Sequence, residues 1–198
     1  MGTFGAVVTD GSRTFLLSNN HVIGRSNDAR PGERIVQPDC NTTTADTIAT
    51  FSRLIPMVFS QSANNRVDAG IALSTDADID RQTACAAYGG VRTPVQVQLG
   101  DKVQKIGRTT GHRTGTVTAI NSTILVNYGS GKGVARFTGQ IEVGQPGFGG
   151  PGDSGSLIVL DPTREAVALL FAGSSSRTFG NPILEVETAL GVKIKCAP

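Results

Sequence analysis

Charged residues are scarce in this chain, at 17% of its 198 residues, and aromatic residues make up only 5%. So small a charged fraction is not typical of a disordered tail or of a coiled coil. Hydrophobic residues still account for 38%, which excludes a low-complexity sequence. No apolar run approaches the length of about 18 residues that a membrane-spanning helix needs. The composition, with 25 glycines and 9 prolines, therefore indicates a single globular domain of this length.

The net charge is small as well, at +2, and basic residues do not cluster anywhere along the chain. A protein that binds nucleic acid or an acidic membrane surface generally presents a concentrated positive charge. We therefore expect neither a nucleic acid nor a membrane as a partner.

Cysteine is also rare, and Cys40, Cys85 and Cys196 lie far apart. Their spacing fits neither a zinc site nor a disulfide-rich secreted domain, and the sequence does not show which two could form a bridge. The N-terminal residues lack the charged and long apolar regions of a signal peptide. We therefore expect a cytoplasmic location rather than secretion, unless an export segment has been removed.

Short apolar stretches alternate with turn residues along most of the chain, which predicts many strands. Asp10-Gly11 is a good hairpin turn between strands at 5–8 and 14–18, because glycine tolerates positive φ. The segment 76–90 is less regular and is expected to hold a loop or a helical turn. Further strands are expected at 34–37, 44–51, 70–73, 102–107, 115–121, 123–128, 133–142, 156–160 and 166–172, with turns at 121–122 and 161–163.

One helix is expected near the C-terminus. Asn181 would cap it, Pro182 suits its first turn, and Gly191 would end it. Apolar residues recur at helical spacing at Ile183, Val186 and Leu190. Many evenly spaced strands with few helices favour an antiparallel barrel or sandwich over a parallel sheet.

The glycine-rich segment 149–156 carries one serine that could react with a substrate. Ser154 stands between Asp153 and Gly155, just ahead of an apolar strand. Glycines on both sides allow a tight turn that exposes the hydroxyl and leaves backbone N–H groups to bind negative charge on a carbonyl oxygen. The alternative is an ordinary glycine-rich turn with a solvated serine.

A serine hydroxyl is a weak nucleophile until a base takes its proton, and the chain has two histidines. His21 follows the apolar strand 14–18 and precedes a polar loop, so its ring could project into a cleft. His112 lies in the segment 108–115, which is expected to be an exposed turn, and it is interpreted as a solvent-facing side chain. His21 is therefore the candidate base.

A carboxylate should hold the imidazole in the right orientation. Asp68 is a lone acid at the mouth of the apolar strand 70–73 and is preferred. Asp46 is its main competitor. The remaining acids of this region are expected to lie in a solvated loop, and these are Asp76, Asp78 and Asp80.

These segments resemble the chymotrypsin-type serine peptidases, closest to the bacterial streptogrisin branch. The order His21, Asp68, Ser154 is the family's order of histidine, aspartate and serine. The motif around Ser154 is similar to that family's nucleophile motif, and residues 17–21 resemble its histidine segment. Residues 68–71 resemble the Asp-x-Gly-Ile pattern of the streptogrisin branch, as do the stretches 109–111, 115–121 and 126–129.

The resemblance implies an all-β fold of two packed antiparallel six-stranded β-barrels with a short C-terminal helix. The single domain would span 1–198, with the first barrel over about 1–90 and the second over about 91–198. It implies a serine endopeptidase acting on protein or peptide substrates without a metal or organic cofactor. His21 would be the general base, Asp68 its orienter and Ser154 the nucleophile, with the backbone N–H groups of Gly152 and Ser154 as the oxyanion hole.

The resemblance also places a substrate pocket. Ala172, Gly173 and Ser174 match the strand that binds the substrate backbone in the family, and the base of the pocket would fall near Phe148. No acidic residue occurs between 144 and 151 that could attract arginine or lysine. An apolar or small residue is therefore expected at the cleavage site.

The sequence departs from the family pattern in several places. Asn20 and Val22 stand where secreted relatives commonly have a cysteine pair beside the histidine, which suits a reducing compartment. Gly155 is followed by Ser156 rather than by a second glycine. Asp153 needs a cationic partner, for which Arg108 is our hypothesis.

Little sequence precedes the first strand, so the first barrel could be incomplete and further domains or partner proteins could complete the protein. These departures keep a second hypothesis open, namely a peptidase-like binding or regulatory domain that is inactive alone or needs a partner.

Overall fold

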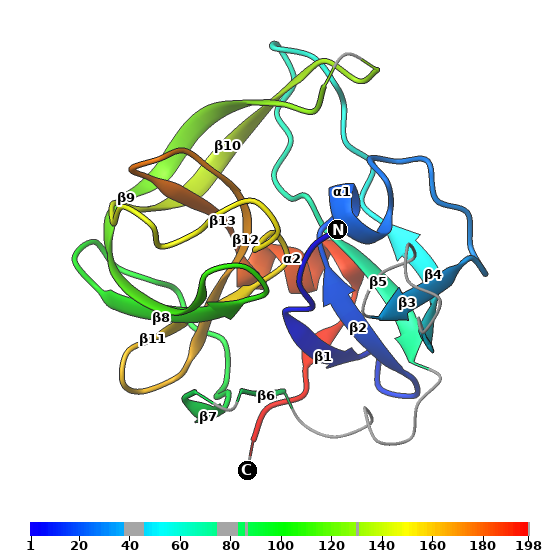
Figure 1. Cartoon of the computed structure of the whole chain (residues 1–198), viewed down its shortest axis with the longest axis horizontal. Helices are drawn as coiled ribbons and strands as arrows, with labels where there is room; N and C mark the ends of the chain where they lie inside the picture. The colour runs from blue at the N-terminus through cyan, green and yellow to red at the C-terminus, as the bar shows by residue number, and fades with distance from the viewer. Residues whose placement is uncertain (38–45, 75–82, 86, 130, 198) are drawn as a thin grey trace.

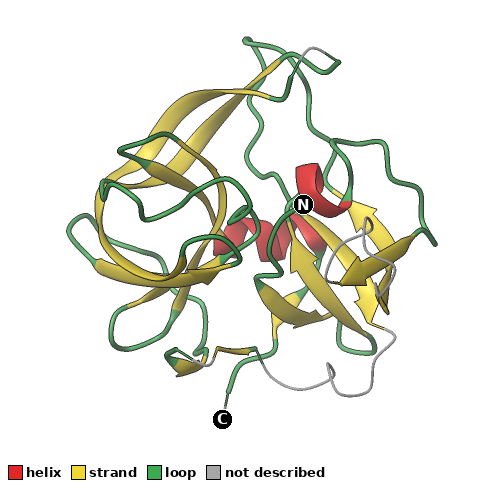
Figure 2. Cartoon of the chain, in the orientation of Figure 1, coloured by secondary structure: helices red, strands yellow, loops and turns green. Residues whose placement is uncertain are grey.

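The part of the chain that the structure describes forms two antiparallel sheets of six strands each, a short two-stranded hairpin and two short helices (Figures 1 and 2). The computed structural model describes residues 1–37, 46–74, 83–85, 87–129 and 131–197. The predicted all-β fold with a short C-terminal helix is thus confirmed. No helix in the described ranges is long and apolar enough to cross a membrane.

The first sheet has the strand order β14-β1-β2-β5-β4-β3 and lies on the right in Figure 1. Its hairpin β1–β2 turns at Asp10, whose carboxylate accepts hydrogen bonds from the backbone N–H groups of Ser12 and Arg13. Helix α1 (Asn20–Ile23) follows β2 at once. The strands are β1 (Ala6–Thr9), β2 (Thr14–Ser18), β3 (Arg34–Gln37), β4 (Asp46–Leu54), β5 (Gly70–Ser74) and β14 (Lys193–Ile194).

The second sheet closes into a barrel in the order β10-β13-β12-β11-β8-β9. A short hairpin of β6 (Ala84–Cys85) and β7 (Gly89–Gly90) lies below it in Figure 1. The barrel strands are β8 (Lys102–Gly107), β9 (Gly111–Asn127), β10 (Val134–Val143), β11 (Leu157–Leu160), β12 (Ala166–Gly173) and β13 (Thr178–Pro182).

The strands predicted at 14–18, 34–37 and 102–107 match the observed bounds, and those predicted at 5–8, 70–73, 133–142, 156–160 and 166–172 agree to within one residue. The two strands expected at 115–121 and 123–128 are one long strand, β9, because the positive φ of 59° at Asn121 makes a local irregularity rather than a turn. Strand β13 was not expected. Much of the irregular segment 76–90 lies outside the described residues.

The C-terminal segment returns to the first sheet. Helix α2 (Ile183–Leu190) leads to Gly191, whose φ of 63° suits a residue without a side chain, and β14 then pairs with β1. Side chains of α2 and β14, including Ile183 and Ile194, are buried in one cluster with Val8 and Phe15 of β1 and β2. The end of the chain therefore completes the sheet that its beginning starts, while the expected boundary near residue 90 stays a prediction.

Asn181 does not cap α2 as predicted. It lies inside strand β13 with a fully buried side chain, and Pro182, the last residue of that strand, takes the position before the helix. The amide of Asn181 is instead used inside the protein, as described below. Of the three cysteines, Cys196 has a free thiol, whereas Cys40 lies outside the described residues.

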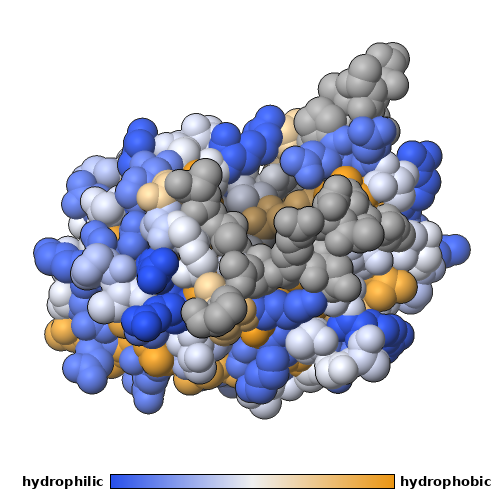
Figure 3. Space-filling model, turned by 90° about the horizontal axis from the view of Figure 1, so that it is seen from below, coloured by the Kyte–Doolittle hydropathy of each residue, from blue (hydrophilic) through white to orange (hydrophobic). Residues whose placement is uncertain are grey.

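The end of the β9–β10 hairpin reaches across to the first half of the chain. The backbone N–H of Arg136 on β10 donates to the carbonyl oxygen of Ser60, and the N–H of Asn65 donates to the carbonyl oxygen of Arg136. In Figure 1 this hairpin runs upward beside the cyan loop that follows β4. The described part of the face in Figure 3 carries hydrophilic residues with only small separate apolar areas, so the apolar side chains are mainly inside.

Candidate active site

The two predicted residues of the first sheet meet through a hydrogen bond. His21 lies in α1, just after β2, and Asp68 lies just before β5, the strand beside β2. The distance from His21 Nδ1 to Asp68 Oδ2 is 2.6 Å, and the backbone N–H of His21 donates to Asp68 Oδ1 at 3.0 Å. The carboxylate therefore fixes the orientation of the ring and leaves Nε2 on the opposite side.

Asp68 is fully buried, so its charge needs partners inside the protein. Its backbone is held by two buried amides: Asn19 donates to its carbonyl oxygen at 2.8 Å, and its N–H donates to Oδ1 of Asn181 at 2.9 Å. The Asn181 amide group donates in turn to Oε1 of Gln140 at 2.7 Å. The second barrel thus helps to place a carboxylate of the first sheet.

Tyr128 is a further partner of Asp68 and comes from the tip of the β9–β10 hairpin. Its hydroxyl donates to Asp68 Oδ2 at 2.8 Å, and its ring meets the ring of His21 edge to face with 5.8 Å between centroids. Burial, and then the charge and hydrogen bond of Asp68, raise the pKa of Tyr128 far above its usual range. The hydroxyl therefore keeps its proton and acts as a donor to the carboxylate.

Ser154 lies in the loop that precedes β11, which we call the serine loop (residues 149–156). Gly152 and Gly155 flank it with φ values of 99° and 96°, a region that residues with side chains rarely adopt. The backbone N–H of Gly155 donates to the carbonyl oxygen of Leu170, which ties the loop to β12. The glycines predicted to permit a tight turn therefore do so.

His21 and Ser154 line the same cleft, which has a volume of about 810 Å³. No hydrogen bond among the described residues joins the Ser154 hydroxyl to the His21 ring. A long nucleophile-to-base distance is common in an enzyme without substrate. The cleft is also lined by the predicted pocket residues Ala172, Gly173 and Ser174 and by Ile124, Leu125, Val126, Asn127, Tyr128, Gly147, Gly149, Gly150, Pro151, Leu170, Phe171, Ser175, Thr178 and Phe179.

The chemical character of the cleft is apolar. Apart from the His21 ring, none of its described lining side chains is ionisable at neutral pH. Phe171 and Phe179 belong to an apolar cluster that also contains Phe137, whose ring lies 4.8 Å from that of Phe171. A charged group entering the cleft would therefore lose hydration without gaining an opposite charge.

Phe148 does not form the base of this cleft as predicted. Its side chain is fully buried in the core of the second barrel, between Val117 and Val143, and its neighbours Gly147 and Gly149 line the cleft instead. The reason is that a bulky apolar side chain is more stable in the barrel core, where burial removes the most apolar surface from water.

Asp153, the residue before the serine, is bound by Lys105 rather than by Arg108. The ammonium group of Lys105 lies 2.9 Å from Asp153 Oδ2, and both side chains are fully buried. Arg108 is exposed, and none of the ion pairs among the described residues involves it. The hypothesis that Arg108 neutralises Asp153 is therefore wrong, because Lys105 already does so from the inward face of β8.

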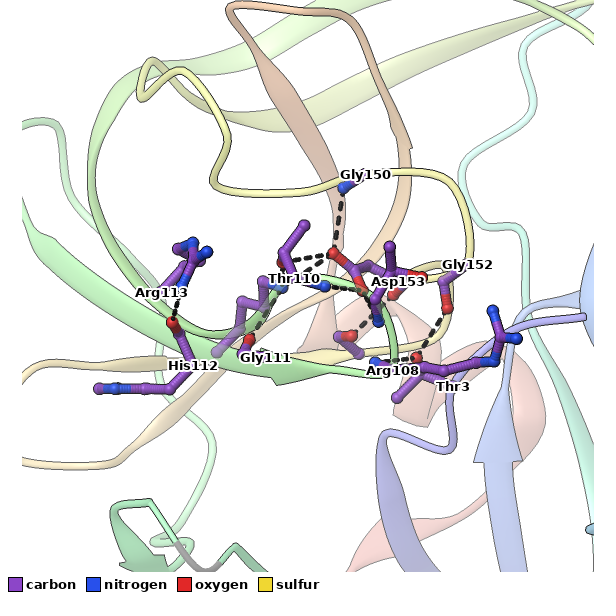
Figure 4. A network of polar contacts seen from close by, with 12 residues as sticks. Thr3, Arg108, Thr110, Gly111, His112, Arg113, Gly150, Gly152 and Asp153 are labelled. Atoms are coloured by element: carbon purple, nitrogen blue, oxygen red, sulfur yellow. Dashed lines mark hydrogen bonds and ion pairs between the residues drawn. The ribbon is translucent and has the colours of Figure 1, made fainter. Parts of the chain in front are cut away.

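Several hydrogen bonds complete the surroundings of Asp153 (Figure 4). Thr110 donates through its hydroxyl to Oδ2 at 2.6 Å and through its N–H to Oδ1 at 3.2 Å. The N–H of Thr109 donates to Oδ1 at 2.8 Å, and that of Gly150 to Oδ2 at 3.0 Å. The carboxylate thus joins the β8–β9 turn to the serine loop.

The pKa values of this pair show what the network achieves. Burial works to raise the pKa of Asp153, but the hydrogen bonds from Thr110, Lys105 and the backbone of Thr109 hold it below its ordinary value. Burial lowers the pKa of Lys105, while the ion pair with Asp153 opposes that shift. At neutral pH the carboxylate is therefore ionised, and its charge is shared among several donors.

The rejected candidates lie away from the cleft. Asp46 is an exposed residue of β4. His112 is exposed as predicted, although it belongs to β9 rather than to a turn, and its Nε2 lies 3.0 Å from Oε1 of Gln104. Asp76, Asp78 and Asp80 lie outside the described residues.

No family model matches the chain. Streptogrisin-A of Streptomyces griseus is 34% identical over 113 residues, which cover 54% of this chain and 35% of that protein. Among solved structures, the Nocardiopsis protease aligns with a TM-score of 0.68 at 17% identity, over 97% of this chain and 91% of that one. A serine protease specific for glutamic acid aligns with a TM-score of 0.67 at 21% identity, over 98% and 92% of the two chains.

The chain has the chymotrypsin-like serine protease fold. Streptogrisin-A and these structural neighbours are bacterial chymotrypsin-like serine proteases, so the resemblance inferred from the motifs is confirmed. The structural likeness extends over nearly the whole chain. The chain spans 15% and 35% of the length of two curated relatives that it matches.

The sequence analysis did not identify three residues that bind Asp153 or Asp68 in the structure. Lys105 did give a signal, because it occupies an inward-facing position of the strand predicted at 102–107. A buried lysine needs a partner of opposite charge, so a buried carboxylate could have been expected beside it. Tyr128 and Asn181 gave no such signal, because their partner Asp68 lies at least 60 positions away and only the folded chain brings them together.

Lys105→Met is expected to lower the free energy of unfolding by about 3–5 kcal/mol, because it leaves the Asp153 charge buried without its cation. Arg108→Ala removes an exposed side chain and should stay within about 0.5 kcal/mol of the wild type. Urea denaturation of both variants at neutral pH measures these values. Equal losses for the two variants would show that Asp153 does not depend on Lys105.

Proposed function

We propose that the chain is a serine endopeptidase that cleaves peptide bonds through an acyl-enzyme. The observation that carries the proposal is the His21 ring, held by the buried Asp68 through Nδ1 and lining one cleft with Ser154. Acyl transfer requires an oriented imidazole and a serine hydroxyl that open into the same cleft. The protease fold gives independent support, because its relatives act on peptide bonds.

In the proposed reaction, Ser154 Oγ attacks the carbonyl carbon of the scissile peptide while Nε2 of His21 takes the hydroxyl proton. The imidazolium passes this proton to the leaving amine, and the acyl group stays on Ser154. Water then attacks the ester in the same way, with His21 again as the base. Asp68 stays ionised throughout and stabilises the imidazolium.

The backbone N–H groups of Gly152 and Ser154 are the proposed donors to the oxyanion. Neither donates to an acceptor among the described residues, so both are available to a substrate. Each donor of this kind is worth roughly 3–4 kcal/mol in the transition state.

The apolar cleft supports a substrate with an apolar or small residue on the acyl side of the cleaved bond. Ala172 and Gly173 are small and leave space for a substrate side chain in the cleft. Phe171 and Phe179 supply apolar surface there. The glutamate specificity of one structural neighbour belongs to that protein, and this cleft holds no described lysine or arginine that would favour an acidic residue.

Tyr128 has a proposed role of its own, as a positioning residue for the His21–Asp68 pair. Its hydroxyl shares Asp68 Oδ2 with Nδ1 of His21, so it helps to fix the carboxylate and stabilises its charge. Its ring also forms one wall beside the imidazole.

Ser154→Ala is expected to abolish hydrolysis of a fluorogenic peptide and covalent labelling by a fluorophosphonate, with little change in the melting temperature. His21→Ala should also abolish the labelling. A folded wild-type chain that is neither labelled nor active would instead support the second hypothesis, a binding or regulatory domain that needs a partner.

Tyr128→Phe is expected to reduce kcat about tenfold with KM nearly unchanged, since one hydrogen bond to a charged group is lost and the cleft keeps its shape. The matched control is Tyr88→Phe, because Tyr88 is the chain's other tyrosine and lies near His112, outside the cleft. Equal activity of the two variants would argue against the positioning role.

A library of peptides that varies the residue before the cleaved bond tests the predicted preference. Apolar or small residues should exceed arginine, lysine, aspartate and glutamate in kcat/KM by at least about tenfold, because a charge is costly to bury without a partner. A clear preference for any charged residue contradicts the assignment of this cleft.

A further inference from the structure

The backbone carbonyl groups at the centre of the serine loop are all held by hydrogen bonds. From residue 150 to residue 154, every backbone carbonyl oxygen accepts at least one hydrogen bond from the protein. The carbonyl oxygen of Gly150 accepts from the N–H of Asp153, and that of Asp153 accepts from the N–H and hydroxyl of Ser156. The carbonyl oxygen of Pro151 accepts from the hydroxyl of Thr109. The carbonyl oxygens of Gly152 and Ser154 accept from the hydroxyl and the N–H of Thr3, respectively.

The N–H groups of the same stretch behave differently. Those of Gly150 and Asp153 donate within the loop, to Asp153 Oδ2 and to the Gly150 carbonyl oxygen. Those of Gly152 and Ser154 have no acceptor among the described residues. The loop is thus fixed from its carbonyl side, while the two N–H groups assigned to the oxyanion hole are left for a ligand.

The peptide group between Pro151 and Gly152 is free to rotate by about 180° unless a contact outside the loop holds it. The peptide between Pro151 and Gly152 is rotated by ψ of Pro151 and φ of Gly152, and the proline ring restricts only its own φ. Gly152 has no side chain and tolerates positive and negative φ alike. Nothing in the local backbone chemistry therefore holds the Gly152 N–H toward the cleft.

The Thr109 hydroxyl supplies that constraint. It lies 2.8 Å from the Pro151 carbonyl oxygen, and Thr109 belongs to the β8–β9 turn rather than to the cleft lining. The peptide group is planar and trans, so its N–H points away from its carbonyl oxygen. A carbonyl held toward Thr109 therefore directs the N–H to the opposite side.

Thr109 is itself placed by the buried ion pair. Its N–H donates to Asp153 Oδ1 at 2.8 Å, and the neighbouring Thr110 donates to the same carboxylate. In Figure 4 Gly150 lies above Asp153 and Thr110 lies to its left, and Thr3 is bonded to Gly152 at the edge of the same network. The charge of Asp153 thus positions the turn whose hydroxyl reaches back to Pro151.

We propose that Thr109 is a positioning residue of the oxyanion hole, whose hydroxyl holds the Pro151–Gly152 peptide with the Gly152 N–H directed into the cleft. This inference rests on the proposed peptidase function. It assigns no contact between Thr109 and substrate, so its effect should appear in the rate of the chemical step and not in substrate affinity.

The experiment compares Thr109→Val, which removes the hydroxyl but keeps the shape, with Thr109→Ser, which keeps the hydroxyl. Rates are divided by the concentration of active sites titrated with a fluorophosphonate, so that unfolded protein does not lower the measured kcat. Thr109→Val should lower kcat about fivefold with KM unchanged, and Thr109→Ser should restore it. Thr118→Val is the matched control, since the hydroxyl of Thr118 donates to Glu142 on the barrel strands.

A peptide aldehyde gives a second readout. It forms a hemiacetal with the serine whose oxygen occupies the oxyanion hole, whereas an uncleaved peptide amide does not. Thr109→Val should weaken aldehyde binding by the same factor as it lowers kcat/KM, and Thr118→Val should leave it unchanged.

Three results would overturn the inference while the peptidase function stands: wild-type kinetics in Thr109→Val, an equal loss in Thr109→Ser, or a loss confined to KM. A wild-type chain without turnover or labelling would overturn the proposed function, and the role of Thr109 with it.

Discussion

The buried carboxylate of Asp153 is the constraint on which the serine loop depends. A carboxylate without water must find a cation and donors inside the protein, and Asp153 finds them in Lys105, Thr110 and the backbone around them. These donors belong to β8 and the turn after it, so satisfying one charge brings two distant segments together. Because Ser154 follows Asp153 directly, the contacts that stabilise the Asp153 charge also fix the position of the serine.

A second buried carboxylate, that of Asp68, holds the histidine on the other side of the cleft. Asp68 is buried in the first sheet, yet Tyr128 and Asn181 reach it from the second barrel. Each buried charge is therefore satisfied by residues of more than one element. Tyr128 and Asn181 thus tie the His21–Asp68 pair to the second barrel, whose serine loop carries Ser154.

The fold could be predicted from the sequence, because it depends on local signals. Short apolar stretches between turn residues indicate the strands, and the glycines around Ser154 indicate a turn. Partners were harder to predict, since they depend on where a strand faces. The family resemblance suggests an arginine for Asp153, namely Arg108, whereas Lys105, three positions earlier, points inward and forms the ion pair. Phe148 was likewise placed by its distance along the chain, although its size favours the core.

Because β14 pairs with β1, the first sheet cannot be completed while only the first half of the chain has been synthesised. When β1 to β5 leave the ribosome, the edge of β1 has no neighbour, and α2 is not yet present to cover Val8 and Phe15. Asp68 also lacks the Asn181 amide until residue 181 has been synthesised. The first sheet therefore stays incomplete until residues 193–194 emerge, so its first five strands wait for a segment that follows every strand of the second barrel.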